Sequence, residues 1–224
     1  MNRVLLHSCI TLLLFLFSCA PEDDILDNAI NVYPDINIKY YNHNDSTSAE
    51  VVFHSINAFG QPLRLIDNQK IWYNDSIMDF DLSTGKYLRA EYGRGDFHSI
   101  KWVHDEDSVE VLLNMNSFHP SLSSDSLSKF RQDSLLWDDL VLQEDEYVSI
   151  YMGDSSHLVQ YLFHNTLGTK HMPLDSSQVN KFNISDSIYL APNRTKQFGF
   201  DLSGYRGSQG ATIIYADTIF TSIK

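Results

Sequence analysis

The sequence predicts an all-β protein built from one or two antiparallel β-sandwich domains. Residues 51–53 and 71–73 are β-branched and aromatic, and such residues fit the pleated, half-buried surface of a strand. Residues 36–40 alternate apolar and polar side chains, as expected for a strand with one buried face. Turn-forming clusters of Gly, Asn, Asp and Pro interrupt these runs at short intervals, and helical periodicity is nearly absent.

The domain organisation follows from composition and length. Residues 36–116 and 138–224 are each the size of a seven-stranded immunoglobulin-like β-sandwich. Between them, residues 117–137 are rich in serine, which indicates a linker. Apolar spacing within this linker predicts a short helix over 125–137. A single elongated sandwich is the alternative architecture.

The first residues of the chain have the pattern expected of an export signal. A basic start at residues 1–3 precedes an apolar run that is shorter than the roughly 20 residues needed to span a bilayer. Residues 16–19, Leu-Phe-Ser-Cys, resemble the lipobox of bacterial lipoproteins, although Phe17 stands where that family has a small residue. The resemblance implies that residues 1–18 are a lipoprotein signal peptide and that Cys19 carries lipid. A plain secretory signal, with Cys19 left as a free thiol, is the alternative.

Residues 19–35 are expected to form a lipidated acidic tether. Residues 20–24, Ala-Pro-Glu-Asp-Asp, resemble the signal that sends Bacteroidetes-type lipoproteins to the outer face of the outer membrane. The resemblance implies display on the cell surface, whereas a simple solvated tether would be equally compatible with the periplasmic face. No second apolar run is long enough to span a membrane, so the lipid is the expected membrane contact.

The overall charge excludes one class of partner. The chain carries 16 basic and 29 acidic residues, for a formal net charge of −13. Such a surface repels phosphate backbones, so we expect no nucleic-acid binding.

The motif search predicts no catalytic residue, no metal site and no cofactor. Residues 79–85 carry oxygen ligands at alternate positions, as in a calcium-binding loop, but lack the glycine and the closing carboxylate of that motif. We interpret them as a strand entering a hairpin. The acidic clusters at 105–107 and 144–146 are interpreted as solvated turns.

An Asp-Ser or Asp-Thr pair followed by an apolar residue or Thr recurs along the chain. The pattern resembles the acceptor motif for O-glycosylation of exported Bacteroidetes-type proteins. A structural interpretation is equally available, because Asp and Ser favour turns that end where a strand begins. The candidate acceptors are Ser46, Ser76, Ser108, Ser126, Ser134, Ser187 and Thr218.

These observations favour a non-catalytic binding or accessory module of the cell envelope, with a protein or glycan partner. Trp137 ends the predicted linker, so it is expected to be exposed and to contact glycan through its ring. The alternative function is a secreted hydrolase that uses carboxylates, for example a glycan-acting one, on a β-scaffold.

Overall fold

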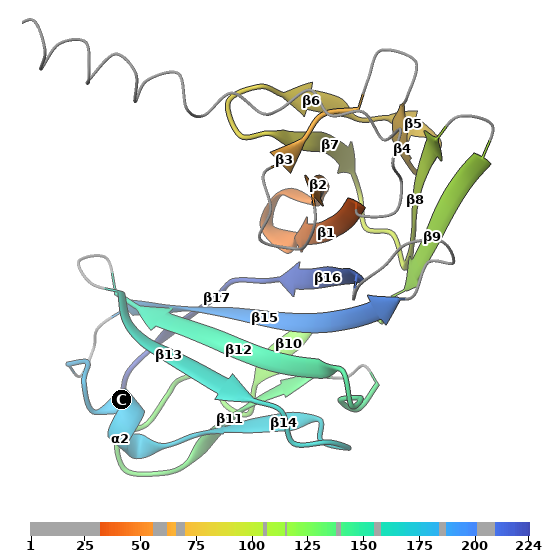
Figure 1. Ribbon diagram of the computed structural model, residues 1–224. Coiled ribbons are helices and arrows are strands. Elements are labelled where there is room, and N and C mark those ends of the chain that lie inside the picture. The colour runs from red at the N-terminus through yellow and green to blue at the C-terminus, as the bar shows by residue number, and fades with distance from the viewer. Residues whose placement is uncertain are drawn as a thin grey trace, which may run out of the picture.

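The computed structural model confirms the all-β class (Figure 1). It describes residues 32–55, 62–65, 70–104, 107–114, 116–137, 140–154, 158–183, 187–200 and 209–224. The predicted signal peptide, Cys19 and most of the predicted tether lie outside these residues. No helix in the described ranges is long and apolar enough to cross a membrane.

The largest sheet has ten strands and joins segments from both halves of the sequence. Its main path is β13-β12-β15-β16-β1-β2-β7-β6, with β17 paired to β15 and β3 paired to β2. The strands are β1 (Val32–Tyr41), β2 (Ser46–Ser55), β3 (Pro62–Leu63), β6 (Asp79–Asp81), β7 (Lys86–Tyr92), β12 (Glu146–Gly153), β13 (Leu158–His164), β15 (Ser187–Phe200), β16 (Gln209–Ala216) and β17 (Ile219–Ser222). The pairs in this sheet are antiparallel except β1 with β16, which run parallel from Asp35 opposite Gly210 to Tyr41 opposite Ala216.

Two smaller antiparallel sheets complete the fold. A four-stranded sheet has the order β5-β4-β8-β9, and a three-stranded sheet has the order β10-β11-β14. Their strands are β4 (Ile71–Tyr73), β5 (Ser76–Ile77), β8 (Phe97–His104), β9 (Asp107–Asn114), β10 (Pro120–Leu122), β11 (Asp133–Trp137) and β14 (His171–Leu174). Trp102 of β8 packs edge-on against Phe53 of β2 with ring centroids 5.6 Å apart, which places the four-stranded sheet over the N-terminal part of the large one.

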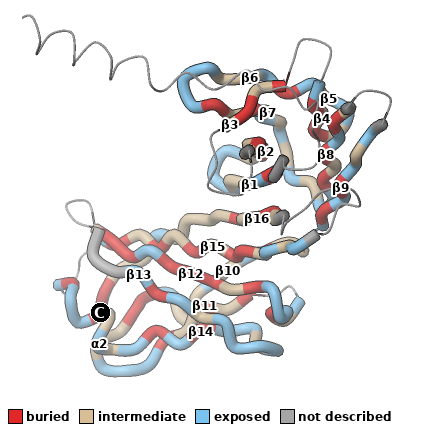
Figure 2. Tube along the Cα trace, viewed as in Figure 1, coloured by how far each residue is buried: buried red, intermediate tan, exposed pale blue. Residues whose placement is uncertain are grey.

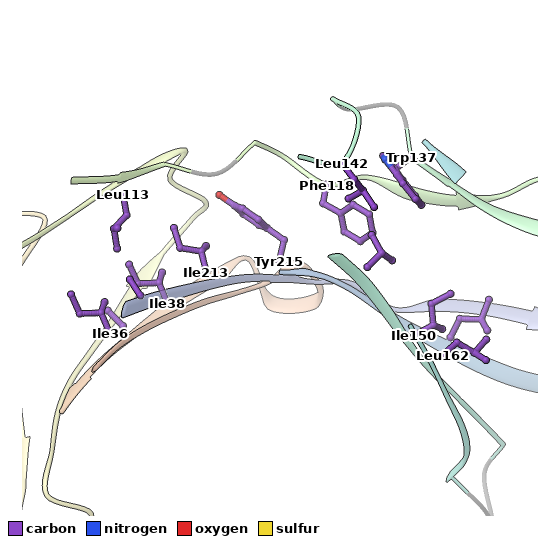
Figure 3. Packing of buried hydrophobic residues seen from close by; sticks show 14 of the residues in the cluster. Ile36, Ile38, Leu113, Phe118, Trp137, Leu142, Ile150, Leu162, Ile213 and Tyr215 are labelled. Atoms are coloured by element: carbon purple, nitrogen blue, oxygen red, sulfur yellow. The ribbon is translucent and has the colours of Figure 1, made fainter. Parts of the chain in front are cut away.

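The buried side chains of both halves belong to one hydrophobic cluster. Figure 3 shows Ile36 and Ile38 near Leu113 at one end, Ile213 and Tyr215 in the middle, and further buried side chains at the other end. Buried positions alternate with half-buried or exposed ones along several strands (Figure 2). The hydrogen-bonded β1–β16 pair therefore links the two halves through both sheet and core.

The helix predicted over 125–137 is wrong, and the segment 117–137 is not a bare linker. It contributes β10 and β11, and Leu127 bridges to Ile223 near the C-terminus. In β11 the buried positions are Asp133, Leu135 and Trp137, which is the two-residue period of a strand. Leu127 and Trp137 are buried whereas Phe130 is 85% exposed, so the apolar residues of this segment do not share one helical face.

One short α-helix in the described residues was not predicted from the sequence. α2 (Ser176–Val179) begins with a capping box: the Asp175 side chain accepts from the Ser177 backbone N–H, and Gln178 Oε1 accepts from the Asp175 N–H at 2.9 Å. The residues 175–178, Asp-Ser-Ser-Gln, carry the sequence signal for this cap.

Candidate binding surface

Trp137 is buried, so the predicted glycan contact at this residue is wrong. Its side chain is 1% exposed and its ring lies 6.2 Å from that of Phe118, inside the C-terminal half. Burial follows from the position of Trp137 at the inward end of β11, where it packs toward the large sheet and His164. An exposed aromatic surface must therefore come from other residues.

The candidate O-glycosylation sites lie at strand beginnings, as the structural interpretation of the motif predicts. Ser46, Ser76 and Ser187 are the first residues of β2, β5 and β15. Ser108 and Ser134 are the second residues of β9 and β11, and Thr218 directly precedes β17. Ser126 is only 7% exposed, so the folded protein does not present it to a transferase.

The calcium-like motif is a hairpin, as interpreted from the sequence. Asp79 and Asp81 lie in β6, and the Asp81 carboxylate accepts hydrogen bonds from Ser83 N, Ser83 Oγ and Thr84 Oγ1 at 2.7 to 2.9 Å. These hydrogen bonds lower the pKa of Asp81. Within the described ranges, no three His, Cys, Asp or Glu side chains gather closely enough to hold a metal ion.

An exposed aromatic surface covers the outer face of four strands in the C-terminal half. On β12 the residues Val148, Ile150 and Met152 are buried, while Tyr147 and Tyr151 point to the opposite face. The register places Tyr161 opposite Tyr151 and Phe220 opposite Tyr189 on this same outer face. We call the six residues the aromatic stripe: Tyr147, Tyr151, Tyr161, Phe163, Tyr189 and Phe220.

The rings of the stripe touch in cross-strand pairs and remain accessible. Tyr147 and Phe163 have ring centroids 4.9 Å apart, and Tyr151 and Tyr161 have theirs 5.0 Å apart. Tyr151, Tyr161 and Phe163 are 40%, 51% and 50% exposed, and Phe220 is 81% exposed. Cross-strand aromatic pairs stabilise a sheet, but so much accessible aromatic area on one face also makes it a candidate binding surface.

The stripe ends in a hollow of about 430 Å³. Tyr147 and Phe163 belong to the stripe and also line the hollow. Two amide side chains and three carboxylates complete the wall of the hollow. The other lining residues are Glu144, Asp145, Glu146, Asn165 and Gln197. The hollow therefore combines two aromatic rings with hydrogen-bond donors and acceptors.

A buried ion pair supports the turn that forms the wall of this hollow. The sequence predicted that residues 144–146 form a solvated turn, and this is correct for exposed Glu144 and Asp145 but wrong for Glu146. The Glu146 side chain is fully buried and accepts a hydrogen bond from Arg194 Nη2 at 2.5 Å. Its Oε2 also accepts from the Gln143 backbone N–H at 3.1 Å, which closes the turn.

A second, more apolar groove lies in the N-terminal half. It encloses about 330 Å³ and is lined by Asn74, Phe97, His98, Ser99, Leu112, Leu113 and Asn114. His98 is 2% exposed, its Nδ1 lies 2.8 Å from the Tyr73 hydroxyl, and burial lowers its pKa to about 4. His98 is therefore neutral at pH 7 and packs as a core residue beneath the groove.

Sequence reasoning did not find the aromatic stripe, although part of its signal is present. Residues 147–151 read Tyr-Val-Ser-Ile-Tyr, which alternates aromatic or polar with aliphatic. The pattern predicts a strand, but it does not say whether the tyrosines or the aliphatic residues face water. Pairing with β13, β15 and β17 decides this, and β15 and β17 lie far from β12 in sequence.

Comparison with known proteins gives no family. No protein family and no curated protein matches this chain in sequence. A solved structure, the central fibronectin-III array of RIM-binding protein, is similar over 88% of this chain and 71% of that chain, with 8% sequence identity and a TM-score of 0.25. The all-β class of this protein rests on the strand pairing described above.

Proposed function

We propose that this protein is a lipoprotein of the bacterial outer membrane that acts as a non-catalytic binding module of the cell envelope. Lipid on Cys19 anchors it, and the acidic residues that follow direct it to the cell surface. The binding partner is a protein or a glycan, and the membrane is contacted through the lipid alone.

The observation that carries the binding role is the exposed aromatic stripe on an otherwise ordinary sandwich face. Scattered exposed apolar residues are normal on a soluble protein, but six aromatic residues on one sheet face are not scattered. Val148, Ile150 and Met152 fill the interior on the other face of β12, and four of the six stripe residues are 40% to 81% exposed on this face.

Anchoring and orientation are tested together in the producing cells. We expect wild-type protein to incorporate a palmitate analogue, and the Cys19→Ser variant to lose that label. Protease added to intact cells is expected to remove the full-length protein. Protection from protease until the outer membrane is opened would contradict surface display, and an unlabelled wild type would contradict the lipid anchor.

A carboxylate-dependent hydrolase is the second candidate function, and one observation favours it. Glu144 and Asp145 line the hollow at the end of the stripe, where a carboxylate could act on a bound substrate. Release of reducing ends from a polysaccharide by the wild type, abolished in Glu144→Gln and Asp145→Asn, would establish this function and refute the non-catalytic one.

A further inference from the structure

We infer that the aromatic stripe and its hollow bind an uncharged polysaccharide chain. The inference rests on the proposed binding function and names the chemical class of the partner. It is carried by the composition of the face, by the spacing of the rings and by the hollow at one end.

The outer face carries no charged side chain at the positions in register with the stripe. Between the aromatic residues of β12, β15 and β17 lie only small or neutral side chains: Ser149, Ala191, Asn193, Thr195 and Ser222. This is unusual in a chain with 29 acidic residues. An anionic polymer gains nothing from such a face and is repelled by the acidic surface, so the face disfavours an anionic partner.

Sugar rings match this surface in chemistry. A pyranose presents C–H groups on its faces and hydroxyl groups around its edge. The C–H groups pack on the electron-rich face of an aromatic ring, while the hydroxyl groups need hydrogen-bonding partners close by. The tyrosine hydroxyls of Tyr147, Tyr151 and Tyr161 have no hydrogen-bond partner in the described part of the chain, so they are available to a ligand.

The spacing suits a chain rather than a single sugar. Tyr147 and Tyr151 lie four residues apart on one strand, a separation of about 13 Å along β12. The stripe then continues diagonally, because Tyr189 is opposite Gly153 on β12 and Phe220 is opposite Tyr189 on β17. A linear polysaccharide laid along this diagonal would contact successive ring pairs.

The hollow provides the directional contacts that stacking lacks. Asn165 and Gln197 can both donate and accept hydrogen bonds, and Glu144 and Asp145 accept them. Small numbers of placed polar groups beside aromatic walls are the usual means by which a site fixes the orientation of a ligand. The hollow therefore holds one part of the chain while the stripe supports the rest.

The test is native affinity electrophoresis of the full lipidated protein in detergent through gels containing one polysaccharide. The probes are hydroxyethylcellulose, glucomannan, xylan and dextran as uncharged chains, and polygalacturonate as the charged control. We expect retardation by at least one uncharged chain and none by polygalacturonate. Replacing Tyr151 and Tyr161 together by Ser should weaken binding by about tenfold or more in total.

The matched control is Tyr92→Ser, since Tyr92 is 86% exposed at the end of β7 and lies outside the stripe. It should bind as the wild type does. Far-ultraviolet circular dichroism checks that both variants are folded. For a stripe variant that does not fold, Phe220→Ser replaces it, because Phe220 is the most exposed member of the stripe.

The inference is overturned if no uncharged chain retards the wild type, or if folded stripe variants bind as tightly as the Tyr92 control. In the second case the protein still binds polysaccharide, but the aromatic stripe is not its binding site. Stripe-dependent self-association seen by light scattering, or stripe-dependent cross-linking to an envelope protein, would likewise overturn the glycan inference while leaving a binding module. Hydrolysis of a retarding chain would overturn the non-catalytic function itself.

Discussion

The fully buried carboxylate of Glu146 accepts a 2.5 Å hydrogen bond from the equally buried guanidinium of Arg194. The pair joins β12 to the neighbouring strand β15 on the inner face of the sheet. Because Glu146 Oε2 also accepts from Gln143 N, the pair fixes the turn that carries Glu144 and Asp145. The Glu146 side chain thus connects the core to the turn that lines the hollow.

We predict that Arg194→Met destabilises the protein by about 3–5 kcal/mol, because it leaves the Glu146 charge buried and unpaired. The double variant Arg194→Met with Glu146→Leu should lose much less, since no charge remains in the core. Urea unfolding of the four proteins in this cycle measures the difference. A double variant as unstable as Arg194→Met alone would contradict the assignment of the cost to an unpaired charge.

The stability of the N-terminal half is predicted to fall as pH drops from about 6.5 toward 4. Burial lowers the pKa of His98 from 6.5 to about 4, partly offset by the nearby Asp96 carboxylate. The unfolded chain therefore binds a proton that the folded one does not, so stability is fully present above about pH 6.5 and is lost below it. The full shift corresponds to about 3 kcal/mol.

The paired variant His98→Leu with Tyr73→Phe removes this titration without leaving the Tyr73 hydroxyl unpaired. We expect its urea midpoint to change less than that of the wild type between pH 7 and pH 4.5. If the urea midpoint changes equally with pH in the two proteins, His98 does not titrate in this range.

Trp137 is predicted to matter for stability and not for ligand binding. Trp137→Ala should cost about 3–5 kcal/mol, because a 1% exposed indole leaves a large cavity, whereas Trp137→Phe should cost less. Polysaccharide retardation by folded Trp137→Phe should equal that of the wild type. A selective loss of binding in this variant, with normal unfolding, would restore Trp137 as a contact residue.

Gly85 is predicted to be required for the β6–β7 hairpin. It has φ of +69°, and a Cβ at this position would lie 3.0 Å from Pro62 Cβ. Gly85→Ala should therefore destabilise the protein by about 1 kcal/mol or more. Gly199→Ala is the control, since a Cβ there meets nothing within 4 Å. Thermal unfolding compares them, and equal midpoints would contradict strain at Gly85.

The sequence by itself determined the all-β class and much of the local structure. Alternation and β-branched residues predicted strands such as 36–40, which lies in β1. The Asp-Ser pairs mark strand beginnings, and Asp81 closes its hairpin as interpreted. These features depend on residues a few positions apart, so local physical chemistry is enough to predict them.

Tertiary structure alone decided which faces are buried and which strands meet. The parallel pairing of Ile38 with Ile213 joins residues 175 positions apart, and no local pattern specifies it. Trp137 was expected at the surface and lies in the core, because β11 faces the large sheet. Tyr151 lies in a strand that the sequence predicts, yet only the register with Tyr161 shows that it faces water beside other aromatic rings. Every strand has two faces, and the strands and sheets that pack against it decide which face is buried.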